Sequence, residues 1–403
     1  MTHWQNRRIH RARLIDRPGL YDLTCDDRGL VAEIDPHDPK IFGVGDRADT
    51  LLNADAIDLH GDWLSPGGVD LQINGALGLA FPDLTLADLP QVDRICQLLW
   101  RQGVQAFLPT IVTTAIEKVH QSLATLAAYQ DYRTQYPAGD RAEIWGAHLE
   151  GPFLNPQKRG AHPQQFLLPL TVNQVAAVVG SHAAQVAKMT LAPELDPTGE
   201  AIDWLRSRGI TVSLGHSQAT AAEAMAAFDR GATMVTHAFN AMPPLHHREP
   251  GLLGAAIVRS GVRCGFIADG VHVCPTMLQV LLRASEGPRG LFMVSDALAP
   301  LGLPDGIYPW DERTIEVKNG TARLSDGTLS GTTLSLLEGV LNLIRWQLCT
   351  PEQAIALATI APRRALGRLP ESADPYGGES PAQLLRWHRQ PDGQWTWRRL
   401  QGP

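Results

Sequence analysis

The chain has 403 residues, of which 44% are hydrophobic and 19% charged, and its formal net charge is −7. This balance is typical of an ordinary soluble globular protein with one large domain and a smaller one, or with two domains. Because the charge is mildly acidic and no basic run stands out, we expect no nucleic-acid partner. The five cysteines form no C-x-x-C pair, so neither a disulfide framework nor a thiolate zinc site is indicated.

The N-terminal segment and the apolar runs bear on location. Residues 1–16 lack the apolar stretch of a signal peptide. No run approaches the ~20 consecutive apolar residues of a membrane span. We therefore expect a cytoplasmic protein without a membrane partner.

Both ends of the chain show the alternation and turns of short β-strands. Near the N-terminus these are residues 9–15, 21–24 and 30–34, and near the C-terminus residues 383–387 and 394–399 flank a Gln-Pro-Asp-Gly turn. We expect a small, discontinuous β domain made of residues 1–63 and 362–403. The catalytic domain would then span residues 64–361.

From residue 64 onward, apolar strands alternate with helical segments, which is the pattern of repeated βα units. The candidate strands are residues 68–73, 104–112, 144–149, 186–192, 210–215, 234–239, 263–268 and 291–295. Eight such units predict an α/β fold of the (β/α)8 TIM-barrel type. A doubly wound sheet would need a glycine-rich phosphate turn after its first strand, and residues 75–78 do not match one. Residues 305–331 contain an Asn-Gly hairpin signal and are predicted to be an insertion near the barrel mouth.

Five of the predicted strands end in residues that can bind a metal or transfer a proton. These are Glu150, His216, His237, Asp269 with the nearby His272, and Asp296. A lone histidine at a strand end is more often a hydrogen-bonded core residue. Five such ends are hard to explain by packing, because the carboxyl ends of barrel strands meet at one mouth, where barrel enzymes carry their active sites.

The residue types define a chemistry. Two histidines and a glutamate with one open position describe a catalytic zinc site, whereas a structural site would close with a fourth protein ligand. We therefore expect Glu150, His216 and His237 to hold the metal. A metal lowers the pKa of bound water to ~7. Asp296 is then suited to act as general base and afterwards as general acid.

Seven motifs, in order along the chain, resemble those of the N-acetylglucosamine-6-phosphate deacetylases in the amidohydrolase superfamily. They are PGGVDLQING (66–75), HLEGPFLNPQKRGAH (148–162), LGHSQAT (214–220), THAFNAMPPLHHREPG (236–251), ADGVH (268–272), SDA (295–297) and LSGTTLSLLEGV (329–340). The resemblance implies an amidohydrolase-type barrel with a small β-sandwich domain built from both chain ends. It also implies hydrolysis of the acetamide of N-acetyl-D-glucosamine 6-phosphate in amino-sugar metabolism.

The resemblance further implies roles for individual residues. Glu150, His216 and His237 would bind one divalent ion per subunit, with Zn²⁺ the first candidate and Fe²⁺, Mn²⁺ or Co²⁺ the alternatives, and Asp296 would be the acid/base. The substrate, a phosphorylated amino sugar, would contact the backbone of Ala161 and the side chains or backbone of His162, Asn240, Ala241, Arg248, Asp269, His272, Leu329, Ser330 and Gly331. In relatives the arginine equivalent to Arg248 can come from a neighbouring subunit, which implies a homodimer. A surface ion pair of Arg248 with Glu249 is the alternative.

The sequence departs from the superfamily pattern in two places. Gln72 and Asn74 stand where many amidohydrolases have two histidines that hold a second metal, and neutral amides bind zinc poorly. We expect these two residues to contact water or substrate instead. The segment beyond Ser372 fits the family weakly.

Two alternative functions remain open at this point. One is a different amide or cyclic-amide hydrolase of the dihydroorotase type, which usually carries a modified lysine at a strand end. Lys188 lies inside a predicted strand instead. The other is a catalytically inactive sugar-phosphate sensor, against which the intact set of Glu150, His216, His237 and Asp296 argues.

Overall fold

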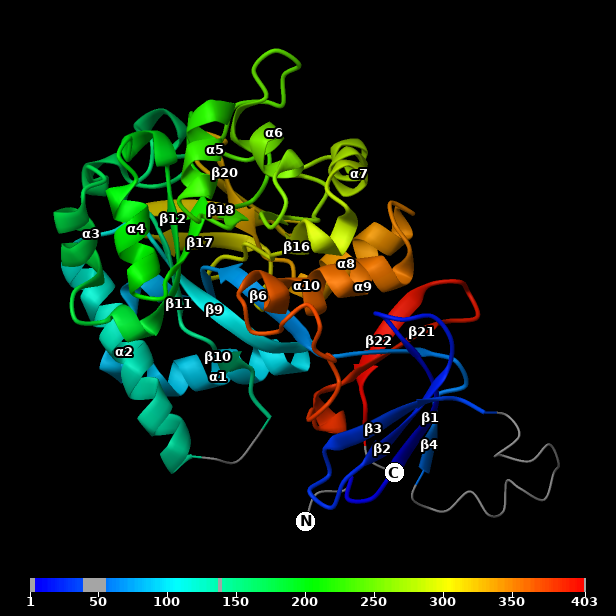
Figure 1. The fold of residues 1–403 in the computed structure, drawn as a ribbon. Helices are drawn as coiled ribbons and strands as arrows, with labels where there is room; N and C mark the ends of the chain where they lie inside the picture. The colour runs from blue at the N-terminus through cyan, green and yellow to red at the C-terminus, as the bar shows by residue number, and fades with distance from the viewer. Residues whose placement is uncertain (1–3, 39–55, 137–139, 402–403) are drawn as a thin grey trace, which may run out of the picture.

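The computed structural model describes residues 4–38, 56–136 and 140–401. The chain forms a large barrel and a smaller β domain beside it (Figure 1). The predicted small domain includes residues 39–55, which lie outside the described residues.

Strands from both ends of the chain build the small domain. Their bounds are β1 Arg8–Leu14, β2 Tyr21–Cys25, β3 Val31–Pro36, β4 Ala56–Asp58, β5 Trp63–Ser65, β21 Leu385–Arg389 and β22 Trp395–Arg399. β1 pairs with β2, β4 and β5, and β21 pairs antiparallel with both β5 and β22. Figure 1 shows the N-terminal and C-terminal strands in one body. The expected β-sandwich domain drawn from both chain ends is therefore present.

Eight parallel strands form the barrel. In order around it they are β6 Gly68–Ile73, β9 Val104–Val112, β11 Ala147–Glu150, β12 Val186–Leu191, β13 Thr211–Leu214, β14 Met234–Val235, β15 Arg263–Phe266 and β16 Leu291–Met293. Ile73 pairs in parallel with Ala297, and the Asp296 N–H donates to the Gln72 carbonyl at 2.9 Å. These bonds join the last strand to the first, which confirms the predicted (β/α)8 barrel.

One predicted strand is interrupted. Residues 144–149 divide into β10, Glu143–Ile144, and β11, and Gly146 lies between them with a φ of +113°. A Cβ atom at Gly146 would lie 2.9 Å from the Ala187 Cβ. Glycine is needed here because the conformation and the close approach both exclude a side chain.

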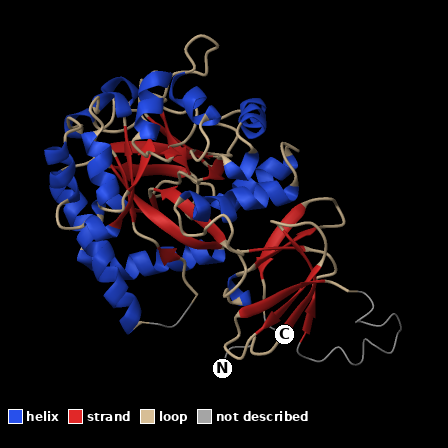
Figure 2. Cartoon of the chain, viewed as in Figure 1, coloured by secondary structure: helices blue, strands red, loops and turns tan. Residues whose placement is uncertain are grey.

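The helices surround the barrel (Figure 2). They are α1 Leu89–Arg101, α2 Ile116–Gln135, α3 Val172–Val179, α4 Glu200–Ser207, α5 Ala221–Asp229, α6 Gly251–Val258, α7 Pro275–Ala284, α8 Leu336–Arg345, α9 Pro351–Ala358 and α10 Ile360–Ala365. A capping box starts α5, in which Thr220 and Glu223 each accept a hydrogen bond from the other's N–H. Among the described residues, no helix is long and apolar enough to cross a membrane.

The predicted insertion is a four-stranded antiparallel sheet between β16 and α8. Its strands are β17 Gly306–Trp310, β18 Arg313–Lys318, β19 Thr321–Leu324 and β20 Leu329–Thr332. Thr332 pairs in parallel with Ala297, which attaches the insertion to the end of the last barrel strand. The insertion therefore lies beside the barrel mouth.

Below the mouth, a chain of hydrogen-bonded polar side chains crosses the barrel interior. His148 Nδ1 lies 3.1 Å from the Thr110 hydroxyl, and His148 Nε2 lies 2.7 Å from the Thr190 hydroxyl. Thr190 continues to Thr236 at 2.7 Å, and Thr236 to Ser213 at 2.6 Å. All five residues are buried and come from five neighbouring strand segments. Their side chains support the strand ends that carry the histidines and Glu150.

Candidate active site

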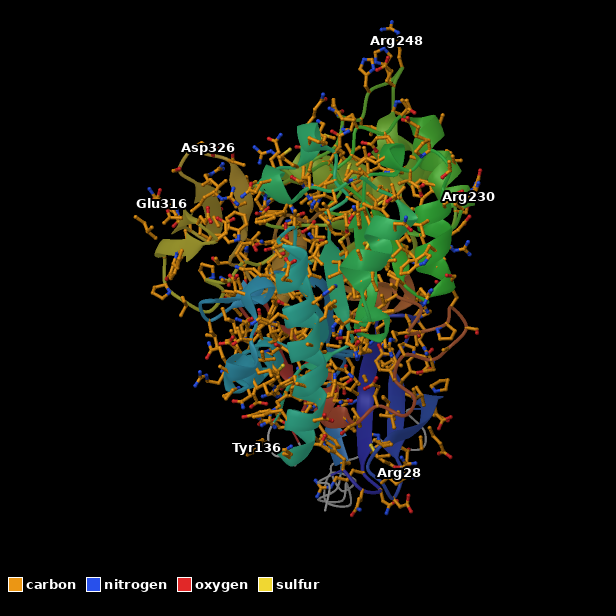
Figure 3. The ribbon with its side chains drawn as sticks, turned by 90° about the vertical axis from the view of Figure 1, so that its left-hand side faces the viewer. Arg28, Tyr136, Arg230, Arg248, Glu316 and Asp326 are labelled. Atoms are coloured by element: carbon orange, nitrogen blue, oxygen red, sulfur yellow. The ribbon has the colours of Figure 1, made fainter. Side chains whose placement is uncertain are left out.

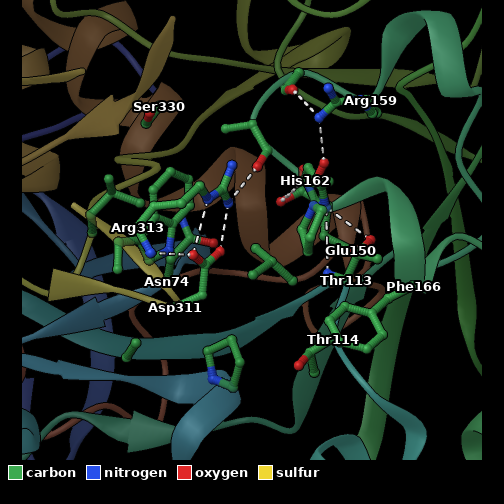
Figure 4. A pocket seen from close by; sticks show the side chains of 18 of the residues that line it. Asn74, Thr113, Thr114, Glu150, Arg159, His162, Phe166, Asp311, Arg313 and Ser330 are labelled. Carbon is green, nitrogen blue, oxygen red and sulfur yellow. Dashed lines mark hydrogen bonds and ion pairs between the residues drawn. The ribbon is translucent and has the colours of Figure 1, made fainter. Parts of the chain in front are cut away.

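A cavity of about 800 Å³ opens at the carboxyl ends of the barrel strands (Figure 4). Most of the predicted site residues line it, namely Asn74, Glu150, Ala161, His162, His216, His237, Asn240, Ala241, His272, Asp296, Leu329 and Ser330. Gln72, Arg248, Asp269 and Gly331 are the predicted residues that do not line this cavity. The mouth therefore gathers side chains from distant parts of the chain into one pocket.

One carboxylate and two imidazoles form a compact triangle at the bottom of the pocket. Glu150 Oε1 lies 3.3 Å from His216 Nε2 and 3.2 Å from His237 Nε2, and the two nitrogens are 3.0 Å apart. A tetrahedral ion at ~2.0–2.2 Å from each ligand separates the ligand atoms by about 3.3–3.6 Å. Glu150, His162 and His216 also place ligand atoms within 4.8 Å of one another. This donor set implies a divalent metal.

Neighbouring groups prepare the triangle for a cation. The His216 Nδ1–H donates to the Lys158 carbonyl at 2.8 Å, which orients the ring with Nε2 toward the triangle. Although burial opposes ionisation of Glu150, the hydrogen bonds and charges of His216 and His237 hold its pKa well below the usual range. Burial also opposes the charged form of His237, but Glu150 raises the pKa of that imidazole. His237 Nδ1 is buried and has no hydrogen-bond partner among the described residues.

Asp296 is held by two amides from the first barrel strand and the residue after it. Asn74 Nδ2 donates to Asp296 Oδ1 at 2.8 Å, and Gln72 Nε2 donates to the same oxygen at 3.2 Å. Gln72 Nε2 also donates to Glu150 Oε1 at 2.9 Å, so one amide group bridges the carboxylates of Glu150 and Asp296. Burial, together with the charge of Glu150, raises the pKa of Asp296. A buried carboxylate with a raised pKa is suited to proton transfer near neutral pH.

His162 lies next to the triangle. Its Nε2 is 3.8 Å from Glu150 Oε2, and its Nδ1 is 2.9 Å from the Thr113 hydroxyl. The Thr113 N–H also points at Nδ1, at 3.4 Å. Burial and the neighbouring His216 lower the pKa of His162 to about 3, so the ring is neutral at neutral pH. The Thr113 hydroxyl donates to the Glu150 carbonyl at 3.2 Å, so the Thr113 N–H is the donor to Nδ1, and the proton of the neutral ring is placed on Nε2.

The remaining predicted residues occupy the walls. His272 Nδ1–H donates to Asp269 Oδ2 at 2.6 Å, and Asp269 Oδ1 accepts from the His272 N–H at 2.9 Å. His272 lines the pocket, and Asp269, which does not line it, orients the His272 ring. Gly331 allows a close approach, because a Cβ atom there would lie 2.8 Å from the Asp296 carbonyl oxygen.

Arg248 is the one predicted residue that the structure places far from the pocket. It lies at the tip of an exposed loop, residues 243–250, that projects from the barrel (Figure 3). In the part of the chain that the structure describes, no ion pair joins it to Glu249. The Arg248 N–H instead points at His246 Nδ1 at 3.3 Å. Arg248 therefore does not line the pocket of its own chain.

Several pocket residues were not predicted. Thr113 and Arg159 lie near His162, Lys118 comes from α2, and residues 310–313 come from the β17–β18 hairpin. Arg159 lies inside the motif HLEGPFLNPQKRGAH (148–162), which is the sequence signal that points to it. The hairpin was expected near the mouth, but nothing in the sequence indicates which of its side chains faces the pocket.

The strand-end residues have an uncommon backbone conformation. φ is +50° at His216, +29° at His237 and +50° at Asp296. Positive φ is uncommon outside glycine, although His and Asp are enriched there, and such residues concentrate at functional sites. The chain turns sharply after each strand, which points the side chain into the mouth.

A (β/α)8 barrel with a carboxylate–imidazole metal site and a buried aspartate at its mouth defines a metal-dependent hydrolase of the amidohydrolase type. No protein-family model matches the chain. The chain is 36% identical to N-acetylglucosamine-6-phosphate deacetylase of Vibrio furnissii over 86% of this chain and 81% of that protein. It is 37% identical to the human protein of the same name, over 77% of this chain and 76% of that protein. The chain belongs to the N-acetylglucosamine-6-phosphate deacetylase family.

Other comparisons agree on the fold and differ on the sugar. The crystal structure of N-acetylglucosamine-6-phosphate deacetylase from Pasteurella multocida superposes with a TM-score of 0.79 at 26% identity, over 98% of this chain and 100% of that one. A mutant of the Mycobacterium smegmatis enzyme, solved in complex with N-acetyl-D-glucosamine-6-phosphate, gives the same TM-score, over 97% of this chain and 99% of that one. An Escherichia coli O157:H7 relative, 33% identical over 76% of this chain and 78% of its own length, is an N-acetylgalactosamine-6-phosphate deacetylase.

Proposed function

We propose that this enzyme hydrolyses the acetamide of N-acetyl-D-glucosamine 6-phosphate to D-glucosamine 6-phosphate and acetate. The observation that carries the proposal is the arrangement of Asp296 beside the triangle of Glu150, His216 and His237, inside one pocket. That arrangement supplies a cation site and a proton acceptor at one barrel mouth. The family relationship supplies the sugar phosphate as the expected substrate.

The protein residues divide the chemistry between them. Asp296 accepts the proton of the attacking water and later returns it to the leaving amine nitrogen, while Asn74 and Gln72 keep its carboxylate in place. The His162 Nε2–H donates a hydrogen bond to the acetyl oxygen as negative charge develops there. His272, oriented by Asp269, and the backbone near Ala161, Asn240 and Leu329 position the sugar.

We propose Glu150, His216 and His237 as the metal ligands and Zn²⁺ as the first candidate ion. Their three donor atoms lie 3.0–3.3 Å apart, whereas His162 Nε2 lies 3.8 Å from Glu150 Oε2. The protonated Nε2 inferred for His162 also favours a substrate contact. When bound, a divalent ion there supplies Lewis acidity for water and for the acetyl carbonyl.

We propose that the enzyme is a homodimer in which Arg248 of one subunit binds the phosphate in the pocket of the other. Each described cation that lines the pocket is already engaged: Lys118 with Asp83, Arg159 with the His162 carbonyl, and Arg313 with Asp311. The loop of Arg248 projects outward (Figure 3). Exposed large apolar side chains support a subunit contact here: Leu245 in that loop, Val258 at the end of α6, Val271 before α7 and Val280 on α7.

Acetate release tests the proposed function directly. The purified enzyme would be assayed on N-acetylglucosamine 6-phosphate, N-acetylgalactosamine 6-phosphate, unphosphorylated N-acetylglucosamine and dihydroorotate, before and after chelation. We expect the first substrate to give the highest kcat/KM, and chelation to abolish turnover until a divalent ion is restored. Faster turnover of dihydroorotate would favour the cyclic-amide alternative, and binding without turnover would indicate a sensor.

A further inference from the structure

The tip of the β17–β18 hairpin reaches over the pocket. Trp310 and Arg313 are paired at the ends of the two strands, and Asp311 and Glu312 form the turn between them. Asp311 has a φ of +51°, as expected in a two-residue hairpin turn. All four residues line the pocket together with the segment 159–163 (Figure 4). A tight turn therefore fixes the position of Arg313 relative to the mouth.

Contacts within the hairpin itself fix the orientation of the Arg313 side chain. Its Nε and Nη2 donate to the two carboxylate oxygens of Asp311, at 2.9 and 2.5 Å. Its guanidinium lies over the Trp310 ring, 5.1 Å from the ring centroid. Such a two-bond fork to a carboxylate restricts the orientation of the guanidinium plane.

From this position Arg313 contacts the segment that carries His162. Arg313 Nη2 donates to the Ala161 carbonyl at 2.9 Å. The next carbonyl, that of His162, accepts from Arg159 Nη1 at 2.8 Å. Residues 160–163 form no helix or strand. The His162 N–H donates to the Arg159 carbonyl at 3.1 Å, and side-chain bonds of this kind add to that turn in holding the segment. Thr113 holds the His162 ring through Nδ1, and Arg313 holds the backbone beside it from the hairpin.

We propose that Arg313 is a positioning residue: it holds the Ala161–His162 segment so that the His162 ring faces the acetyl group of the substrate. The inference rests on the proposed function, because it assigns Arg313 a purpose in that reaction. Arg313 would act through His162 and would not bind the phosphate, since its fork is already occupied by Asp311.

Three variants test the proposal. Arg313→Ala removes the bond to Ala161, and Arg313→Lys keeps a cationic donor without the fork. Arg323→Ala is the matched control, because Arg323 is in the same sheet and also donates to a backbone carbonyl, that of Gly327 at 3.0 Å, but does not line the pocket. We expect kcat/KM to fall roughly tenfold or more in Arg313→Ala, since a charged hydrogen bond is lost, and to recover in part in Arg313→Lys. The kcat/KM of Arg323→Ala should match that of the wild type. The metal content of all three variants should also match it.

Two further measurements separate positioning from other roles. In a His162→Ala background, Arg313→Ala should cost much less than in the wild type, because both changes remove the same contact. The loss should also be equal for phosphorylated and unphosphorylated substrate. A full additional loss in the His162→Ala background, or a loss confined to the phosphorylated substrate, would overturn the proposal.

Amide hydrogen exchange supplies a readout that does not depend on turnover. Arg313→Ala should speed exchange in residues 159–165 while the barrel strands stay protected. Unchanged exchange there would refute this inference even if the wild type deacetylates the sugar. A wild-type enzyme without deacetylase activity would instead refute the proposed function, so the two failures can be told apart.

Discussion

The Asn74 side chain donates a 2.8 Å hydrogen bond to the carboxylate of Asp296. The bond links the end of the first barrel strand, β6, to the loop after the last, β16. An asparagine at position 296 could still accept this bond through its amide oxygen, but it could not take up a proton. The bond therefore allows the acid/base role to be tested without dismantling the site.

Asp296→Asn should lower kcat by roughly 10²-fold or more, because proton transfer contributes about that much. Metal content and affinity for the product glucosamine 6-phosphate should stay close to those of the wild type. Steady-state kinetics, elemental analysis and calorimetric titration measure the three quantities. A kcat near the wild-type value would show that another group moves the proton.

We predict one functional metal ion per chain. Gln72 Nε2 donates to both Glu150 and Asp296, so a neutral amide occupies the position from which a second ion would need charged or imidazole ligands. Two dications at ~3.5–4 Å repel strongly without such ligands. Activity of the apo enzyme should rise linearly and level off at one equivalent of added metal.

The double substitution Gln72→His with Asn74→His supplies imidazole ligands for a second ion. It should raise the metal content of dialysed protein toward two equivalents per chain. Activity of the unmodified enzyme that appears only above one equivalent would contradict the single-ion prediction.

Arg248→Ala should weaken binding of the phosphorylated substrate far more than that of N-acetylglucosamine, by roughly 30-fold or more in KM, because a guanidinium–phosphate contact is lost. Mixing the Arg248→Ala and Asp296→Asn variants tests where the arginine acts. In hybrid dimers, a contact between subunits leaves one pocket with both residues intact, so activity should recover. No recovery in verified hybrid dimers would show that Arg248 acts within its own chain.

Asp70, on β6, predicts a pH dependence of stability. Burial raises its pKa to about 7, against ~3.9 for an unfolded chain. Between pH ~4 and ~7 the folded state binds more protons than the unfolded state, so this group contributes stability at low pH that is lost as the pH rises. In metal-free protein, Asp70→Asn should flatten the fall in Tm between pH 5 and 8, whereas Asp229→Asn, which removes an exposed carboxylate on α5, is the control. An unchanged slope in Asp70→Asn would contradict the prediction.

Most barrel strands could be predicted because a strand buried on both faces is a short apolar run with clear ends. The break at Gly146 could not, since it depends on the approach of Ala187 from the next strand. Helix α6 could not be predicted from periodicity, because its sequence, GLLGAAIV, is apolar throughout. The domain limits at residues 63–64 and 361–362 stay predictions.

Part of the site was equally visible in the sequence. Glu150, His216 and Asp296 directly follow apolar strands, and the barrel brings strand ends together whatever the loops do. The contact of Arg313 with Ala161 was not visible, because it requires the hairpin to fold over a loop far away in the chain. Arg248 illustrates the opposite case, in which a motif identifies a residue that its own chain does not bring to the pocket.

The positive φ values at His216, His237 and Asp296 set a limit on engineering. Each such residue costs about 1–3 kcal/mol in conformational strain, which glycine would largely avoid. Directed evolution toward heat resistance alone would therefore favour replacing the three side chains on which turnover is proposed to depend. A thermostable variant of this enzyme should be selected with activity in the same screen.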